Sequence, residues 1–213
     1  MLEKMDLFFE ARLDGYDEHM LTNIHGAQEF YPFTADCLPE GKLLDLGCGT
    51  GLELQYYFAR HPQSQVTGID LSVGMLDALR EKFPHRDLTL IQGSYFDVPL
   101  GEDRFDGAVS VESLHHFTQA EKIGLYRKLH AALKPGAYFI LTDYFAADDA
   151  EEQAFFAEFA QLKTAEGIAD EDFYHFDTPL TVAHEKEAMI AAGFSRVEEL
   201  AAWGATHILK AYK

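Results

Sequence analysis

The sequence predicts an α/β fold in which a doubly wound, mostly parallel sheet is covered by helices on both faces. Three observations support this prediction. Strand and helix patterns alternate through the middle of the chain, a glycine-rich turn joins the first strand of that alternation to a helix, and the next strand ends in an acidic residue. With 213 residues, 47% of them hydrophobic, the chain can bury the core of one domain.

The first strand and helix of the alternation surround the stretch "LLDLGCGTGLEL". Apolar residues on both sides of Asp45 indicate a buried strand that ends near Gly47, and Leu52–Arg60 contains enough helix formers for a helix. The pattern continues as strand, helix, strand, strand, helix and strand over residues 64–71, 73–83, 87–93, 104–113, 118–133 and 137–145. Residues 134–136, Lys-Pro-Gly, are expected to stop the last of these helices.

The pattern changes from Asp148 onward. We expect a helix over 148–167, an aromatic-rich loop over 168–181, a helix over 182–194, and two closing strands over 195–203 and 205–213. The segments at about 1–40 and 146–180 lie outside the regular alternation and are rich in aromatic residues and histidine. We expect both to form a helical cap over the carboxyl edge of the sheet, within a single domain of residues 1–213.

The composition excludes several classes of function. Lys and Arg number 17 against 36 Asp and Glu, so the formal net charge is −19, which argues against a nucleic-acid partner. No apolar run reaches the roughly 18 residues of a membrane span, and the N-terminus is too acidic for a signal peptide. Cys37 and Cys48 form no disulfide framework. We therefore expect a cytoplasmic monomer or homodimer with no membrane partner.

The glycines of the turn indicate a ligand site. Gly47, Gly49 and Gly51 come where the first strand meets a helix, and glycine lets a ligand approach the backbone closely. Their spacing differs from the dinucleotide pattern, whose third glycine would replace Leu52, and no Gly-Lys-Ser/Thr phosphate loop follows. Asp70 ends the second strand, where a carboxylate can accept hydrogen bonds from both hydroxyl groups of a ribose. The apolar residues available to flank an adenine are Ile69, Leu71 and Met75.

Four stretches together resemble the motifs of the class I S-adenosylmethionine (SAM)-dependent methyltransferases. They are "LLDLGCGTG", "VTGIDLSVGML", "FDGAVSVESLHHF" and "LKPGAYFILTDY", in the family's order within residues 41–145. The resemblance implies a Rossmann-like, seven-stranded sheet with an antiparallel C-terminal strand, and SAM as the cofactor. It also implies an enzyme that transfers the sulfonium methyl group to a small-molecule acceptor by in-line displacement.

The resemblance also assigns residues to the cofactor. Asp45 would orient the turn and the amino end of SAM, the glycines would line the methionine part, and Asp70 would bind the ribose. The family often holds adenine with an acid after the third strand, where this chain has Ser94. The full set expected to bind the cofactor is Tyr16, His19, Asp45, Gly47, Gly49, Gly51, Asp70, Leu71, Met75, Ser94, Tyr95, Phe96 and Glu112.

Few catalytic side chains are required, because the methyl group of SAM is already activated. A base is needed only where the acceptor must lose a proton, and the candidates by position are His115, His116, Tyr144 and Asp143. Histidines hydrogen-bonded at a strand-to-helix turn are the alternative interpretation of the pair. No further ligand stands at metal-binding spacing, so no metal is expected. Residues 173–176 are expected to form a wall for the acceptor.

Two alternative functions remain open. The layout after the fifth strand also resembles carboxy-SAM synthases and related tRNA-modification enzymes, with an "AGF" turn at residues 192–194. Those synthases have an arginine four residues before the alanine of that turn, where this chain has Ala188. The second alternative is a protein that binds SAM without catalysis. The sequence does not define the acceptor or its attacking atom.

Overall fold

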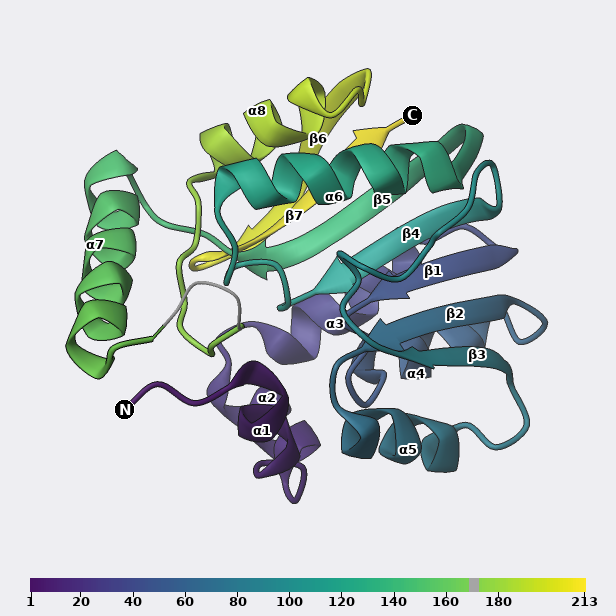
Figure 1. The fold of residues 1–213 in the computed structure, drawn as a ribbon. Helices are drawn as coiled ribbons and strands as arrows, with labels where there is room; N and C mark the ends of the chain where they lie inside the picture. Colours follow the sequence, from purple (N-terminus) through teal and green to yellow (C-terminus); the bar gives the residue numbers. More distant parts are fainter. Residues whose placement is uncertain (169–172) are drawn as a thin grey trace.

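A seven-stranded sheet forms the centre of the computed structural model, which describes residues 1–168 and 173–213 (Figure 1). The strands are β1 (Lys42–Leu46), β2 (Gln65–Asp70), β3 (Asp87–Gln92), β4 (Phe105–Val111), β5 (Leu133–Tyr144), β6 (Arg196–Trp203) and β7 (Thr206–Tyr212). They lie in the order β3-β2-β1-β4-β5-β7-β6. Strands β1 to β5 pair in parallel, and β7 runs antiparallel to both β5 and β6. The predicted sheet with an antiparallel C-terminal strand is confirmed.

Helices cover both faces of the sheet (Figure 1). They are α1 (Met5–Glu10), α2 (Tyr16–Asn23), α3 (Ala27–Asp36), α4 (Leu52–Arg60), α5 (Val73–Lys82), α6 (Gln119–Ala132), α7 (Asp149–Glu166) and α8 (Val182–Ala191). One face of the sheet packs against α6 and α8, and the other packs against α3, α4 and α5. Because β1 and β4 are buried on both sides, they are nearly continuous apolar runs in the sequence. None of the helices in the described ranges combines the length and apolar composition that a membrane span requires.

Local sequence signals explain where several helices begin and end. Thr118 and Glu121 form a capping box at the start of α6, and the side chain of Ser72 caps α5. The expected helix stop at residues 134–136 takes a different form. Helix α6 does end at Ala132, but these three residues already belong to β5, at an irregularity in its pairing with β4.

The two expected cap segments meet each other. Met5 N donates to the carbonyl oxygen of Phe173 at 3.0 Å, and His175 N donates to that of Glu3 at 2.9 Å. Helix α3, in contrast, packs on a sheet face against α4, and α7 has no buried residue and stands apart from the sheet (Figure 1). Residues 169–172, part of the predicted aromatic loop, lie outside the described residues.

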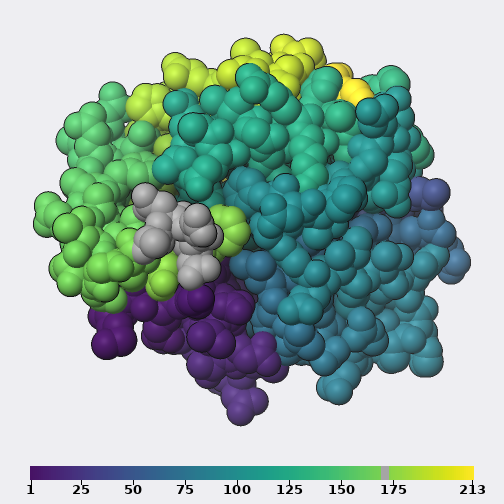
Figure 2. Space-filling view, viewed as in Figure 1, coloured from purple at the N-terminus to yellow at the C-terminus, as the bar shows by residue number. Residues whose placement is uncertain are grey.

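The N-terminal segment lies against the rest of the domain, as Figure 2 shows in purple, between the green α7 segment and the blue region that contains α5. Two acidic side chains of this segment bind it to residues of the α5 region. Glu10 Oε2 accepts a hydrogen bond from Ser72 Oγ at 2.7 Å, and Asp17 pairs with Lys82 Nζ at 2.6 Å. Both partners belong to the segment that forms and caps α5, so α1 and α2 are held over the carboxyl edge of the sheet.

Candidate functional site

The glycine-rich turn connects β1 to α4 at the carboxyl edge of the sheet. Gly47 and Gly49 have φ values of +72° and +47°, which residues with a Cβ rarely adopt. A Cβ on Gly47 would lie 2.0 Å from Ser113 Oγ, so this position has no room for a side chain. A Cβ on Gly49 would meet no atom within 4 Å. The turn therefore presents open backbone at Gly49.

Asp70, at the end of β2, ties this turn to the start of α5. Its Oδ2 accepts a hydrogen bond from Gly49 N at 2.9 Å, and its Oδ1 accepts one from Ser72 N at 2.9 Å. Burial raises the pKa of Asp70, while these backbone hydrogen bonds oppose the rise. Each carboxylate oxygen keeps a further lone pair, so the group can still accept hydrogen bonds from a ribose.

A small cavity of about 50 Å³ lies beside the turn and Asp70. The residues expected to bind the cofactor that line it are Tyr16, Gly47, Gly49, Asp70, Leu71, Met75, Tyr95 and Glu112. Met5 and Phe9 of α1 also line it. Binding sites for small molecules usually measure about 300–1,000 Å³, so in this conformation the cavity is too small for a ligand of nucleoside size.

The other residues expected to bind the cofactor lie elsewhere. His19 lines a neighbouring cavity, and Gly51 is the N-cap of α4. Ser94 Oγ accepts a hydrogen bond from Phe96 N at 3.2 Å, and the Phe96 ring packs within an aromatic cluster. Asp45 is buried behind the turn. Ser94 and Phe96 are thus engaged in a local turn and in apolar packing.

Two buried carboxyl groups lie together behind the turn. Asp45 in β1 is 1% exposed and Glu53 in α4 is 4% exposed. Burial, and then the charge of Glu53, raises the pKa of Asp45 well above its usual range, and burial raises the pKa of Glu53. Within the described ranges, Asp45 Oδ2 and Glu53 Oε1 have no hydrogen-bond partner. The Asp45–Glu53 pair can therefore hold a proton. The two unpartnered oxygens could also accept hydrogen bonds from a cationic group.

A larger cavity of about 950 Å³ adjoins the small one. The two cavities share the lining residues Phe9, Tyr16, Glu112 and His116. The candidate catalytic residues His115, His116 and Tyr144 all line the larger cavity. Of residues 173–176, expected to form the acceptor wall, His175 lines it. Its volume is that of a site for a small organic molecule.

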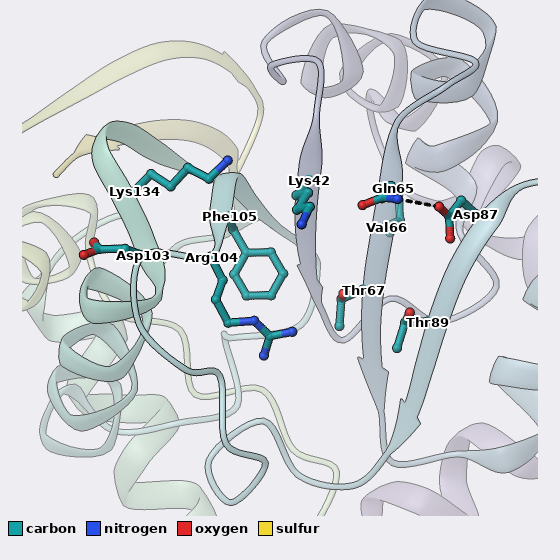
Figure 3. A pocket seen from close by; sticks show the side chains of 10 residues that line it. All are labelled: Lys42, Gln65, Val66, Thr67, Asp87, Thr89, Asp103, Arg104, Phe105 and Lys134. Carbon is teal, nitrogen blue, oxygen red and sulfur yellow. Dashed lines mark hydrogen bonds between the residues drawn. The ribbon is translucent and has the colours of Figure 1, made fainter.

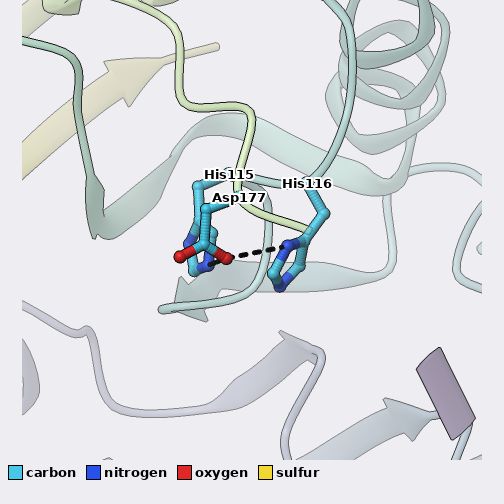
Figure 4. Close-up of side chains that lie close together, drawn as sticks. All are labelled: His115, His116 and Asp177. Atoms are coloured by element: carbon cyan, nitrogen blue, oxygen red, sulfur yellow. Dashed lines mark ion pairs between the residues drawn. The ribbon is translucent and has the colours of Figure 1, made fainter. Parts of the chain in front are cut away.

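His115, His116 and Asp177 lie together on the wall of the larger cavity (Figure 4). His115 Nδ1 lies 2.6 Å from Asp143 Oδ1, and Asp143 also accepts hydrogen bonds from two backbone N–H groups, at 2.9 and 3.0 Å. This contact leaves His115 Nε2 facing Asp177 Oδ1, 3.5 Å away. His116 Nδ1 lies 3.4 Å from the same oxygen.

Burial and neighbouring charges give the two histidines different charges. Burial opposes a charge on His115, but Asp143 and then Asp177 outweigh it and raise the pKa of His115 to about 10. Burial, together with the charge of His115, holds the pKa of His116 well below its usual range. Burial also opposes a charge on Asp177, but the nearby cationic ring of His115 keeps the pKa of Asp177 low. Without a ligand, His115 is therefore cationic and His116 neutral.

Glu112 follows β4 at the boundary between the two cavities. Its φ is +48°, a conformation that is uncommon for residues other than glycine. Its Oε1 accepts a hydrogen bond from Thr206 Oγ1 at 3.0 Å. Burial, and then the negative charge of Asp143, raises the pKa of Glu112 to about 7. Strained backbone of this kind concentrates at functional sites.

Three acids at this edge were not predicted: Glu10, Asp17 and Asp177. Each acts through partners far away in the sequence, and no motif surrounds any of them. The only available signal was their position in the two segments that lie outside the regular strand and helix alternation. Their roles therefore depend on how the cap packs.

A further depression of about 410 Å³ lies at the opposite end of the sheet (Figure 3). Lys42, Gln65 and Asp87, at the amino ends of β1, β2 and β3, are among its lining residues, and Gln65 Nε2 donates to Asp87 Oδ2 at 2.7 Å. Ligands of open parallel sheets bind beyond the carboxyl ends of the strands. We therefore assign the ligand site to the two cavities at the carboxyl edge.

Comparisons with known proteins show that the chain is similar to methyltransferases. Residues 43–136 match the family model described as a methyltransferase domain. An uncharacterised methyltransferase of Synechocystis is 33% identical over 57% of this chain and 57% of its own length. The 24-methylenesterol C-methyltransferase 3 of Arabidopsis thaliana is 28% identical over 68% of this chain and 42% of its own length. The chain thus spans about half the length of the curated relatives it matches.

The fold is also that of solved methyltransferase structures. The crystal structure of a proposed O-methyltransferase from Nostoc punctiforme superposes with a TM-score of 0.74 at 23% identity. The superposition covers 99% of this chain and 62% of that one.

Proposed function

We propose that the chain transfers the sulfonium methyl group of SAM to a small-molecule acceptor. The proposal is supported by the match of residues 43–136 to a methyltransferase domain and by the fold, which is that of solved methyltransferase structures. The observation that carries the proposal is the contact between the two cavities. They meet at a wall formed by Phe9, Tyr16, Glu112 and His116. In-line displacement needs the acceptor atom opposite the departing sulfur, so the methyl group would lie at this shared wall.

The residues at the smaller cavity fit SAM. Open backbone at Gly49 allows the methionine part to approach. Asp45 lines neither cavity, so from behind the turn it would act on the amino end of SAM indirectly, by positioning the turn. Asp70 would accept hydrogen bonds from the ribose, while Leu71 and Met75 would flank the adenine. SAM supplies the activated methyl group, so the protein has to bind the reactants, align them and exclude water.

Entry of the cofactor would require the N-terminal cap to open. Met5 and Phe9 line the small cavity, and Glu10 and Asp17 hold the cap in place. Once SAM has bound, closure of the same segment would exclude water from the sulfonium. The cap would thus act as a lid as well as a wall of the acceptor cavity.

The larger cavity favours a neutral or cationic acceptor with an apolar body. The aromatic residues that line it include Phe8, Phe9, Tyr16, Tyr144 and Trp203. The carboxylates that line it are Asp14, Glu112 and Asp177. The guanidinium of Arg12 also lines it but is paired with Glu3 at 3.1 Å. Cationic His115 is likewise paired, with Asp143 at 2.6 Å and Asp177 at 3.5 Å, so an anionic acceptor would meet mostly negative charge. Sterols have such an apolar body, and the Arabidopsis relative is named as a methyltransferase of a sterol.

Position 188 gives the carboxy-SAM synthase alternative no support. Ala188 in α8 is buried in the core against α6 and lines neither of the two cavities. The alternative of a protein that binds SAM without catalysis differs from our proposal only in turnover. A measurement of methyl transfer is therefore needed to separate the two.

Two measurements test the proposal. Calorimetry should show that S-adenosylhomocysteine binds and that NAD does not. Incubation with methyl-labelled SAM and separate pools of neutral, cationic and anionic small molecules should give labelled product, first in the neutral and cationic pools. Gly49→Val should abolish both results, because its side chain would enter the cavity and resist the positive φ.

Gly167→Val is the matched control, because Gly167 also has a positive φ and open space around it but ends α7 away from both cavities. S-adenosylhomocysteine binding without labelled product in any pool would favour silent SAM binding. A carboxylated cofactor after incubation with SAM and prephenate would favour the synthase. If S-adenosylhomocysteine fails to bind the folded parent protein, the cofactor assignment is wrong.

A further inference from the structure

The cluster of His115, His116 and Asp177 has the composition of a metal site. One ligand atom from each residue lies within 4.8 Å of the other two. The histidines follow β4, whereas Asp177 comes from the segment that leads to α8, and Figure 4 shows the three side chains close together. Thr178 N donates to the carbonyl oxygen of His115 at 2.8 Å, which holds Asp177 beside the histidines. The fold therefore completes a set of ligands that the sequence spacing did not reveal.

The distances in the cluster fit a bound ion better than direct hydrogen bonds. His115 Nε2 and His116 Nδ1 lie 3.5 and 3.4 Å from Asp177 Oδ1. Hydrogen bonds between nitrogen and oxygen are usually about 2.7–3.2 Å long. Nitrogen and oxygen atoms bind Zn²⁺ at about 2.0–2.2 Å, and two ligands of a tetrahedral ion are then about 3.3–3.6 Å apart. Both observed separations lie in that range.

The hydrogen-bond partner of His115 is also typical of a metal site. His115 Nδ1 lies 2.6 Å from the carboxylate of Asp143, which leaves Nε2 as the ligand atom. Histidine ligands usually donate their second N–H group to a carboxylate or a backbone carbonyl in this way. His116 Nδ1 lies 3.1 Å from the carbonyl oxygen of Phe176, which can only accept, so this contact places a proton on Nδ1. An ion bound at Nδ1 would replace that hydrogen bond and leave the proton of His116 on Nε2.

The surrounding charge favours a cation. Glu112 and Asp143 lie beside His115, and one ligand atom from each of these three residues also falls within 4.8 Å of the others. Within the described ranges, the ion pairs of Asp177 are with His115 and His116. Its charge is therefore offset by cationic His115, which becomes a neutral ligand when it binds a metal.

We propose that His115, His116 and Asp177 bind a divalent transition-metal ion, and Zn²⁺ has the geometry that matches best. All three residues line the larger cavity, so the remaining coordination positions would face the acceptor. Binding of the ion does not depend on the proposed function. Only its use, to hold a hydroxyl or thiol group of the acceptor, rests on that function.

Titration of the full chain, after removal of metal by a chelator, tests the site with Zn²⁺ and Co²⁺ as probes. We expect one ion per chain with a roughly micromolar or lower dissociation constant, and visible absorption bands of tetrahedral coordination with Co²⁺. Asp177→Asn and His115→Gln should each weaken Zn²⁺ binding at least about tenfold. Melting temperatures establish that both variants are folded.

His184→Gln is the matched control, because His184 forms an ordinary ion pair with Glu152 at 2.9 Å outside the larger cavity. It should bind Zn²⁺ as the parent does. The inference is wrong if the parent binds no Zn²⁺ below about 1 mM, if Asp177→Asn binds it unchanged, or if the control loses as much affinity as Asp177→Asn. S-adenosylhomocysteine binding should be measured on the same metal-free protein. If that protein binds S-adenosylhomocysteine but no Zn²⁺, the metal inference fails and the proposed function does not.

Discussion

The carboxylate of Asp143 fixes the ring of His115, with Asp143 Oδ1 lying 2.6 Å from His115 Nδ1. The backbone N–H groups of Leu114 and Tyr144 hold that carboxylate in turn, at 2.9 and 3.0 Å. A buried carboxylate that accepts backbone hydrogen bonds cannot easily turn away, so the imidazole keeps Nε2 directed toward the cavity wall. Asp143 is therefore a positioning residue, and His115 is the group that it positions.

Asp143→Asn should weaken Zn²⁺ binding without changing cofactor binding. The amide group of asparagine can present N–H groups to Nδ1, which would favour the tautomer that carries its proton on Nε2, the proposed ligand atom. We expect a loss of about 10–100-fold in Zn²⁺ affinity by calorimetry. S-adenosylhomocysteine affinity should stay the same, because Asp143 does not line the cavity at the glycine turn. Unchanged Zn²⁺ affinity would show that the carboxylate does not position the ring.

Asp70→Ala should reduce both cofactor affinity and stability. It removes the acceptor for the N–H groups of Gly49 and Ser72, and hydrogen bonds to charged groups contribute about 1.5–3 kcal/mol each. We expect at least about a tenfold loss of S-adenosylhomocysteine affinity and a lower melting temperature. Asp70→Asn keeps one acceptor oxygen, so its melting temperature should fall less. Asp87→Asn, at the opposite end of the sheet, is the control, and unchanged affinity in Asp70→Ala would refute the ribose assignment.

Glu10→Ala should open the N-terminal cap more often. Its carboxylate accepts hydrogen bonds from Ser72 Oγ at 2.7 Å and Gly74 N at 3.2 Å, and these contacts hold α1 over the small cavity. We expect S-adenosylhomocysteine to dissociate roughly 5–30-fold faster, which corresponds to about 1–2 kcal/mol of lost contacts. Stopped-flow displacement measures the rate. Glu18→Ala, on the exposed side of α2, should leave it unchanged, and equal rates in all three proteins would exclude the cap as a gate.

Asp45→Asn should stabilise the ligand-free protein more at neutral than at acid pH. Burial raises the pKa of Asp45 well above its usual range, so the folded protein keeps a proton that the unfolded chain loses above about pH 4. The contribution of this group to stability is therefore greatest in acid and falls as the pH rises toward the folded pKa. Asparagine does not titrate and has no such loss.

Thermal unfolding at several pH values measures this difference. The melting temperature of Asp45→Asn minus that of the parent should increase between about pH 5 and pH 8. Asp87→Asn should show a nearly constant difference, because Asp87 is exposed. A difference that decreases with pH for Asp45→Asn would mean that Asp45 is not protonated in the folded protein.

The sequence by itself determined the strands, the helices from α4 onward and the place of the glycine-rich turn. Hydrophobic periodicity, helix caps and the backbone freedom of glycine act over a few residues, so they can be recognised locally. Gly47, Gly49 and Asp70 could also be brought together in advance, because they stand at the carboxyl ends of strands that the pattern predicts to be parallel. The antiparallel C-terminal strand followed from the resemblance to a known family.

Only the tertiary structure decided how the two cap segments pack together and which of their side chains line the two cavities. The backbone hydrogen bond between Thr178 N and His115 O brings Asp177 to His115 and His116. Phe9 lines the small cavity beside the glycine turn because residues 3–5 pair with residues 173–175. Phe96, expected at the adenine, packs in an aromatic cluster instead. Contacts of this kind join segments far apart in the chain, and which of them form depends on the packing of the whole molecule, because no local pattern contains both partners.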